Sequence, residues 1–288
     1  KESALRDLFN NTKAQDAPIY SSLVSAAPPQ PSPDTLVTTA RGIDIFQPGA
    51  NLQPTLVKQI TLDNEGNKLE LTGGYAHQIV FNDDGTLAFI AGRNGKIYVF
   101  DTMTQDVVST YRVVGAAART SSLAINDGWL YVAEGNNYGA GARLVRINID
   151  TGPDFLKKQQ SLNIPGLIAP TGFRDIAINS GRYLAVTAPA GVIGLMNFPR
   201  PSPGNVYVID LYGVDDKSNI TDEFVTTLDL TAYASSFLGK GPQYITSGEK
   251  RGEFLVSNAK DYNKGAAGVV FETDGKTGKL SGKATVAE

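Results

Sequence analysis

The sequence predicts an all-β fold, a β-propeller built from four-stranded antiparallel blades, of which about five are visible. Three observations lead to this prediction. From residue 36 onward, short apolar blocks alternate with turn signals. The blocks recur as a unit of four strands, and no amphipathic stretch is long enough for the crossover helix of an α/β fold.

The individual blocks have the composition of β-strands. Lys96–Asp101 (KIYVFD), for example, is rich in the β-branched and aromatic residues that strands favour. Turns such as Asp83–Gly85 and Asn126–Gly128 separate the blocks, and their glycines supply the positive φ angle that tight hairpins require. The pattern therefore predicts successive antiparallel hairpins.

Four pairs of blocks align as repeats. Each pair is a strand, a polar turn and a second strand: Gln78–Asn82 with Leu87–Ala91, Ser122–Asn126 with Leu130–Ala133, Asp175–Asn179 with Leu184–Thr187, and Gln243–Ser247 with Phe254–Ser257. A third strand follows, and near copies of it at 97–101 and 206–210 make Phe100 equivalent to Ile209. Fourth strands are expected at 107–111 and 224–228.

An incomplete unit precedes these repeats, with its third strand at 42–46 and its fourth at 57–61. It lacks an obvious first strand, and propellers usually close by pairing strands from both ends of the chain. We expect the missing strand either from Ile19–Val24 or from beyond Glu288. The second interpretation, in which the chain is part of a larger propeller or protein, is favoured.

Residues 1–35 have a different character. Ser3–Lys13 is predicted to form a short amphipathic helix, and the proline-rich stretch at 26–33 is predicted to be an extended linker. The expected organisation is therefore an N-terminal helix and linker over 1–35, followed by the propeller domain over 36–288.

Composition excludes several classes of function. The formal net charge is −3 and no run of Lys or Arg exceeds two residues, which argues against nucleic-acid binding. No stretch approaches the roughly 18 apolar residues of a membrane span. With no cysteine and one histidine, His77, the chain lacks the ligands of a zinc site, and we expect no metal and no cofactor.

The run from Phe81 to Thr102 resembles a repeat of the Tyr-Val-Thr-Asn type bacterial propellers. These are related to lactonase-like propellers and often lie within large cell-surface proteins. The resemblance covers about residues 36–286 and implies the fold far more strongly than a function. The sequence departs from the Trp-Asp repeat family, because its single tryptophan, Trp129, is not followed by aspartate.

Ionisable residues offer two routes to an enzyme, each with a simpler alternative. His77 is expected beside the central channel, where it would be a general base or, more simply, a hydrogen-bonded loop residue. Glu134, Asp175 and Asp261 are expected on loops of one face, where two of them would form a carboxylate dyad. The simpler interpretation of Asp175 is an ion pair with Arg174 or a hydrogen bond at the strand start. The acidic turns at 83–85 and 215–216 lack the spacing of a calcium loop.

Loops that join second to third strands, or one blade to the next, share one face of a propeller and often form its binding surface. The candidate binding residues on this face are Tyr75, His77, Arg119, Glu134, Asn137, Tyr138, Arg174, Asp175, Val192, Ile193, Phe198, Asp261 and Tyr262. Val192, Ile193 and Phe198 belong to the longest insertion, Ala188–Gly204, whose prolines and glycines predict a loop without helix or strand. Its apolar side chains are expected to pack on the propeller's own face or to contact another chain.

These observations predict a non-catalytic binding or scaffolding propeller. The resemblance implies that it is a segment of a larger bacterial extracellular or envelope protein, with a protein partner or flanking domains. The alternative is a lactonase-like hydrolase that acts on a small sugar-type substrate at the channel mouth. An enzyme should bring ionisable groups together around His77, Arg174 and Glu134 or Asp175, whereas a scaffold should leave them scattered.

Overall fold

The computed structural model of the protein describes residues 35–39, 42–48, 53–71, 79–113, 119–135, 143–150, 152–167, 169, 172–189, 191–193, 200–202, 204–229, 244–257, 268–273 and 280–287. Within these ranges the regular elements are strands, apart from two 3-10 turns at Leu211–Gly213 and Asp222–Phe224. The fold is therefore all-β, as predicted. The expected N-terminal helix, the linker and the Ile19–Val24 segment lie outside the described residues.

The first three sheets follow one another along the chain. A three-stranded sheet contains β1 (Thr35–Thr38), β2 (Ile43–Pro48) and β3 (Pro54–Ile60). The next sheet contains β4 (Ile79–Phe81), β5 (Leu87–Ala91), β6 (Lys96–Asp101) and β7 (Asp106–Arg112). The third contains β8 (Arg119–Asn126), β9 (Trp129–Gly135), β10 (Arg143–Asn148) and β11 (Gln159–Leu162).

Two further four-stranded sheets follow. One contains β12 (Asp175–Asn179), β13 (Tyr183–Ala188), β16 (Asn205–Asp210) and β17 (Val225–Asp229). The other contains β18 (Tyr244–Ser247), β19 (Glu253–Ser257), β20 (Gly268–Thr273) and β21 (Leu280–Ala287). Neighbouring strands in each sheet pair antiparallel, so the predicted four-strand grouping is confirmed.

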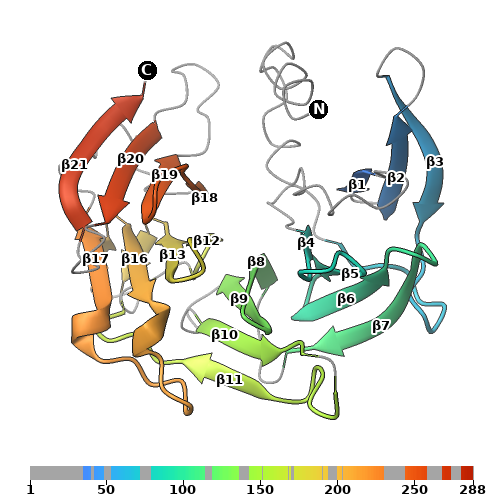
Figure 1. Ribbon diagram of the computed structural model, residues 1–288, viewed down its shortest axis with the longest axis horizontal. Coiled ribbons are helices and arrows are strands. Elements are labelled where there is room, and N and C mark those ends of the chain that lie inside the picture. Colours follow the sequence, from blue (N-terminus) through green and yellow to red (C-terminus); the bar gives the residue numbers. More distant parts are fainter. Residues whose placement is uncertain are drawn as a thin grey trace.

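The sheets succeed one another around an arc (Figure 1). The first strands, β4, β8, β12 and β18, lie toward the inside of the arc, and the last strands, β7, β11, β17 and β21, lie along its outside. Adjacent first strands contact one another, β8 with β4 and β12 with both β8 and β18. The inner strands therefore pack in series along the concave side of the arc.

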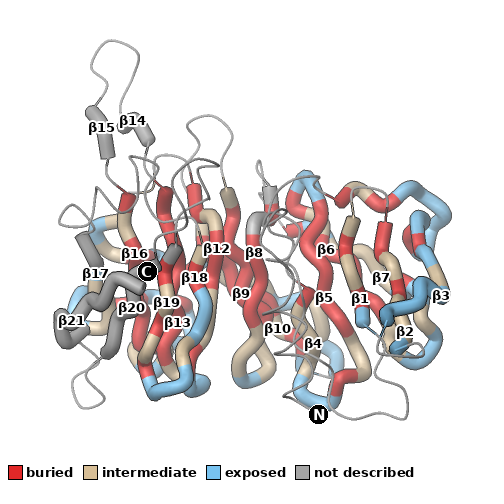
Figure 2. Tube along the Cα trace, turned by 90° about the horizontal axis from the view of Figure 1, so that it is seen from above, coloured by how far each residue is buried: buried red, intermediate tan, exposed pale blue. Residues whose placement is uncertain are grey.

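Apolar clusters fill the spaces between successive sheets. Leu36 and Ile43 of the first sheet pack with Ile90 of the second, and comparable clusters lie between each following pair of sheets. The central sheets are buried on both faces, so every residue of β13 is buried, and Figure 2 shows such buried stretches through the middle of the molecule. This explains why β13 is apolar throughout (YLAVTA) instead of alternating.

Strand register confirms one predicted equivalence. Phe100 pairs with Ala88 and Ile209 pairs with Leu184, so each next-to-last residue of a third strand faces the second residue of a second strand. Both side chains are buried.

The alignment of Leu87 with Leu130 is wrong by one residue. Leu87 pairs with Asp101, the last residue of its third strand. In the next sheet, the last residue of the third strand is Asn148, and it pairs with Trp129. Trp129, and not Leu130, is therefore the equivalent of Leu87. The turn that precedes Leu87 is longer than the turn that precedes Trp129, and the apolar pattern does not report turn length.

The insertion at 188–204 contains strands, contrary to the prediction that it would have none. Its segments β14 (Gly191–Ile193) and β15 (Arg200–Ser202) form a two-stranded antiparallel sheet, with Val192 opposite Pro201. Both strands of such a ribbon are edges, so a proline can lie in one of them without removing a hydrogen bond from a central ladder.

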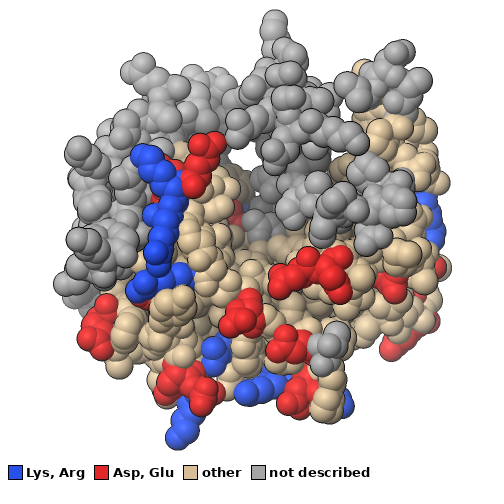
Figure 3. All heavy atoms as spheres, viewed as in Figure 1, with Lys and Arg blue, Asp and Glu red and all other residues tan. Residues whose placement is uncertain are grey.

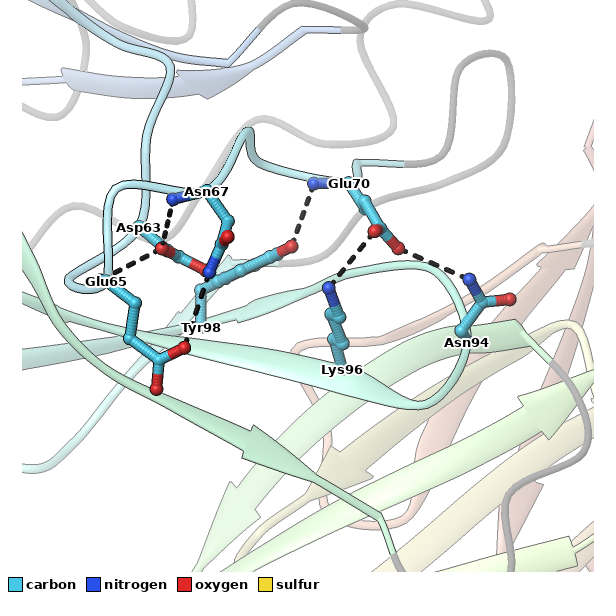
Figure 4. A network of polar contacts seen from close by, with 7 residues as sticks. All are labelled: Asp63, Glu65, Asn67, Glu70, Asn94, Lys96 and Tyr98. Atoms are coloured by element: carbon cyan, nitrogen blue, oxygen red, sulfur yellow. Dashed lines mark hydrogen bonds and ion pairs between the residues drawn. The ribbon is translucent and has the colours of Figure 1, made fainter.

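A polar network joins the segment after β3 to β6 (Figure 4). Tyr98 Oη accepts a hydrogen bond of 2.8 Å from the Glu70 amide, and the Glu70 carboxylate pairs with Lys96 Nζ at 3.1 Å. Nearby, Asp63 Oδ1 accepts from the amides of Glu65 and Asn67. These bonds fix the connection between the first and second sheets.

Candidate functional site

The structure describes only part of the expected binding face. Tyr75, His77, Asn137, Tyr138, Phe198, Asp261 and Tyr262 lie outside the described residues. Arg119, Val192 and Ile193 are described only as members of β8 and β14. The side chains that can be assessed are those of Glu134, Arg174 and Asp175.

Asp175 begins β12 and is buried where three sheets meet. Its Oδ1 accepts hydrogen bonds from the Ser122 hydroxyl of β8 at 2.7 Å and from the Ile176 amide at 3.0 Å. Its Oδ2 accepts from the Ile245 amide of β18 at 3.0 Å, and the Thr187 hydroxyl of β13 accepts from the Asp175 amide. The carboxylate therefore joins the first strands of three consecutive sheets.

Burial dominates the ionisation of Asp175. Loss of water around the carboxylate raises its pKa to about 6, although the donated hydrogen bonds and the Arg174 charge oppose this increase. A carboxyl group with such a pKa is a candidate acid or base. Its lone pairs, however, are directed at donors of the protein itself, and only 4% of the residue is exposed.

The environment of Arg174 agrees with the strand-start interpretation of Asp175. The Arg174 guanidinium lies 5.7 Å from the centre of the Tyr244 ring, and its Nη2 is 3.5 Å from Tyr244 Oη. The Arg174 charge also acts on Asp175, since it lowers the pKa of the neighbouring carboxyl group. Hydrogen bonds from Ser122, Ile176 and Ile245 hold that carboxylate at the start of β12.

Glu134 is a second buried carboxylate, with 3% of its surface exposed. Its Oε2 lies 2.8 Å from Nε of Arg143, its register partner on β10. Burial raises its pKa, and the Arg143 charge and hydrogen bond oppose the increase. Within the described residues, its Oε1 has no hydrogen-bond partner, and neither has the hydroxyl of Thr120, which lies opposite on β8.

The two neighbouring sheets have no charged residue at the position of Glu134. Glu134 faces Arg143, the first residue of β10, and the corresponding pairs are Gly92 with Lys96 in the preceding sheet and Ala188 with Asn205 in the following one. These two neighbouring sheets thus have a small residue where this sheet has a carboxylate.

Glu134 and Asp175 do not form a dyad, because a sheet separates them. Ser122, which bonds Asp175, is the register partner of Ala133 and shares its side of the sheet. Glu134 follows Ala133 in β9 and therefore points to the opposite side. Both residues were expected on loops, but Glu134 lies in β9 and Asp175 begins β12. The pairing of these strands separates the two carboxylates that the sequence analysis considered as a dyad.

Ser122 and Arg143 were not among the residues singled out from the sequence, although they hold the two carboxylates. The aligned repeats contained a signal for Ser122, because Ser122 and Asp175 are the first residues of equivalent blocks. Arg143 follows the second-to-third-strand connection, and its pairing with Glu134 requires the register of β9 and β10.

Charge is dispersed over the surface that can be seen. On the face shown in Figure 3, acidic and basic side chains are interspersed, and neither sign covers a broad area. The described residues include no group of three or more His, Cys, Asp or Glu that could hold a metal ion. None of the helices in the described ranges has the length and apolar character to cross a membrane.

Comparison with known proteins shows a likeness in structure only. No family model and no curated protein matches the sequence. Among solved structures, the chain is similar to the Kuenenia stuttgartiensis hydrazine synthase, with a TM-score of 0.55 and 11% sequence identity. The match covers 96% of this chain and 67% of that one. At this level of identity the similarity concerns the fold alone.

Proposed function

We propose that this chain is a β-propeller that serves as a non-catalytic binding or scaffolding unit within a larger bacterial extracellular or envelope protein. The propeller assignment is supported by four-stranded meanders that follow one another around an arc with their first strands inside. The resemblance of Phe81–Thr102 to cell-surface propeller repeats supports the location.

The observation that carries the non-catalytic role is the environment of Asp175. This carboxylate has the perturbed pKa expected of a catalytic group. Its oxygens, however, accept hydrogen bonds from Ser122, Ile176 and Ile245, which link neighbouring sheets. A general base must be within hydrogen-bond reach of its substrate, and a carboxylate engaged in this way is not available for that role. Glu134, on the other side of the sheet, cannot assist it.

The alternative is a lactonase-like hydrolase, and it is tested through His77. The purified chain is incubated with a panel of sugar-type lactones, beside a His77→Ala variant. We expect no hydrolysis above the buffer rate for either protein, and equal thermal unfolding midpoints. Hydrolysis by the natural chain that is lost in His77→Ala would replace the binding role with the enzymatic one.

A partner-docking role is proposed for the insertion that carries Val192, Ile193 and Phe198. Replacing all three with Ser should leave the thermal unfolding midpoint almost unchanged, because side chains that make their contacts with a partner do not stabilise the isolated chain. Differential scanning fluorimetry measures this directly. A large drop in the midpoint would show that the three side chains pack on the protein's own surface.

A further inference from the structure

Two buried oxygen atoms without a hydrogen-bond partner lie on adjacent strands, near the end of β9 and the start of β8. They belong to Glu134 and Thr120, which are register partners and are 3% and 2% exposed. Within the described residues, neither Glu134 Oε1 nor Thr120 Oγ1 has a hydrogen-bond partner. A buried polar atom in this state is costly, so two of them in directly opposed residues need a physical explanation.

Both side chains point to the same side of the sheet. Directly paired residues of antiparallel strands share a side, and so do residues two positions apart along one strand. Val132, two positions before Glu134, belongs to the apolar cluster that contains Phe89 and Val99 of the preceding sheet. Glu134 and Thr120 therefore face the space between the second and third sheets, at the end of this cluster.

The backbone of Glu134 is held from several directions. Its residue pairs with Thr120 on β8 and with Arg143 on β10, and its carbonyl accepts a hydrogen bond of 3.1 Å from the Phe173 amide. The carboxylate is therefore presented from a fixed backbone, and its unpartnered oxygen has a defined place beside Thr120.

The charge of the Glu134 carboxylate is matched through its other oxygen. Oε2 lies 2.8 Å from Arg143 Nε, and the Arg143 side chain is 31% exposed. Among the described residues, Arg143 is the charged group that acts on this carboxyl group. A cationic ligand at Oε1 would be repelled by Arg143 and an anionic one by Glu134, so the pair favours a neutral group.

A hydroxyl group complements the two unpartnered oxygens. An ionised carboxylate only accepts hydrogen bonds, whereas a threonine hydroxyl also donates one. A single hydroxyl can donate to Glu134 Oε1 and accept from Thr120 Oγ1. Directly opposed side chains have Cβ atoms about 5 Å apart, so one oxygen at about 2.7 Å from each partner can bridge them. An ammonium group cannot accept a hydrogen bond, and it adds a second positive charge beside Arg143.

We propose that Glu134 and Thr120 form a subsite that binds a hydroxyl group of a neutral polyol, such as a sugar. The ligand approaches from the ends of the strands, where the Arg143 side chain is partly exposed. Gly92 and Ala188 hold the position of Glu134 in the neighbouring sheets, so neither of these sheets repeats the subsite. This inference rests on the binding role proposed above, for which it names a class of ligand, and it involves no reaction of that ligand.

Saturation-transfer difference NMR on the full chain tests the subsite, with glycerol and glucose as probes. The natural chain should bind both probes saturably, and Thr120→Val and Glu134→Gln should each weaken binding at least about tenfold. Thr38→Val is the matched control and should bind as the natural chain does. Thr38 is also buried and its Oγ1 also has no partner among the described residues, but it is paired with Ile43 instead of a carboxylate.

Three outcomes would overturn the proposal. The first is a natural chain that binds neither probe, in which case the two oxygens share a water molecule. The second is unchanged binding by Thr120→Val, and the third is a preference for methylammonium over both polyols. Thr120→Val should keep the thermal unfolding midpoint of the natural chain, because valine replaces a hydroxyl that has no partner in the protein.

Failure of the subsite is distinguishable from failure of the proposed function. Absence of polyol binding leaves the scaffolding role intact, since that role is tested by lactone hydrolysis and by the insertion that carries Val192 and Ile193. Hydrolysis that is lost in His77→Ala would overturn the non-catalytic role, whether or not Thr120→Val weakens the binding of glucose.

Discussion

At the scale of single residues, the two buried carboxylates differ in how completely the protein compensates for their charge. Asp175 accepts three hydrogen bonds, two of them from other sheets, whereas Glu134 relies on Arg143 for one oxygen. A buried polar atom without a partner costs about 1–3 kcal/mol. Both residues weaken the fold when ionised, since burial raises the pKa of each.

Asp175→Asn should change how stability depends on pH. The pKa of Asp175 is about 6 in the folded chain and about 3.9 in an unfolded one. The folded state therefore binds the proton more tightly than the unfolded state does. The contribution of the protonated Asp175 carboxyl to the free energy of unfolding is present below about pH 4 and is lost as the pH rises through about 6. This loss is on the order of 3 kcal/mol.

Urea denaturation between about pH 4 and 7 measures this effect. Relative to the natural chain, Asp175→Asn should gain stability as the pH rises and level off above the folded pKa. Asp84→Asn is the control, because the Thr86 hydroxyl and amide lower the pKa of exposed Asp84. Its contribution is lost only below about pH 4, so this variant should stay nearly parallel to the natural chain over the same range. Unfolding free energies that stay parallel for Asp175→Asn and the natural chain would contradict the assignment.

At the scale of elements, two asparagines at the ends of first strands, Asn126 and Asn179, hold the turn of the following sheet. Asn126 Nδ2 donates to the Gly181 carbonyl at 3.0 Å. Asn179 holds its turn through both of its polar atoms. Its Oδ1 accepts a hydrogen bond from the Gly252 amide at 2.7 Å. Its Nδ2 lies within 3.1 Å of the carbonyls of Gly248, Lys250 and Glu253. In these two sheets the same repeat position therefore holds the turn of the next sheet, whereas Asn82 bonds Thr86 and Leu87 of its own turn.

Asn179→Ala should destabilise the chain by about 2–3 kcal/mol, because a buried side chain that holds one turn through both of its polar atoms is lost. Asn126→Ala, which removes one exposed hydrogen bond, should cost less than about 1 kcal/mol. Chemical denaturation of the two variants measures the difference. Equal losses would show that the contacts of Asn179 add nothing to the fold.

At the scale of the whole molecule, position in the arc decides how each sheet is buried. Strands β9 and β13 lie in central sheets and are apolar almost throughout. In β2, buried Ile43 and Ile45 alternate with half-buried Asp44 and Phe46, so this end sheet has one side in the core and one facing outward. Continuous and alternating patterns thus distinguish sheets packed on two sides from sheets packed on one.

The sequence alone determined the strands, most of their turns and their grouping in fours. These features are local, because alternation, β-branched residues and turn glycines report on neighbours along the chain. They sufficed to identify Phe100 and Ile209 as equivalent, and to expect for Asp175 either an ion pair with Arg174 or a hydrogen bond at the start of β12.

Only the tertiary structure decided what meets across the sheets. Ser122 and Asp175 are 53 positions apart, and Asp175 and Ile245 are 70 apart, so their bonds depend on how three sheets pack. The separation of Glu134 from Asp175 likewise follows from strand register, in which a shift of one residue moves a side chain to the other face. The length of the turn sets that register, and turn length cannot be deduced from the apolar pattern of a strand.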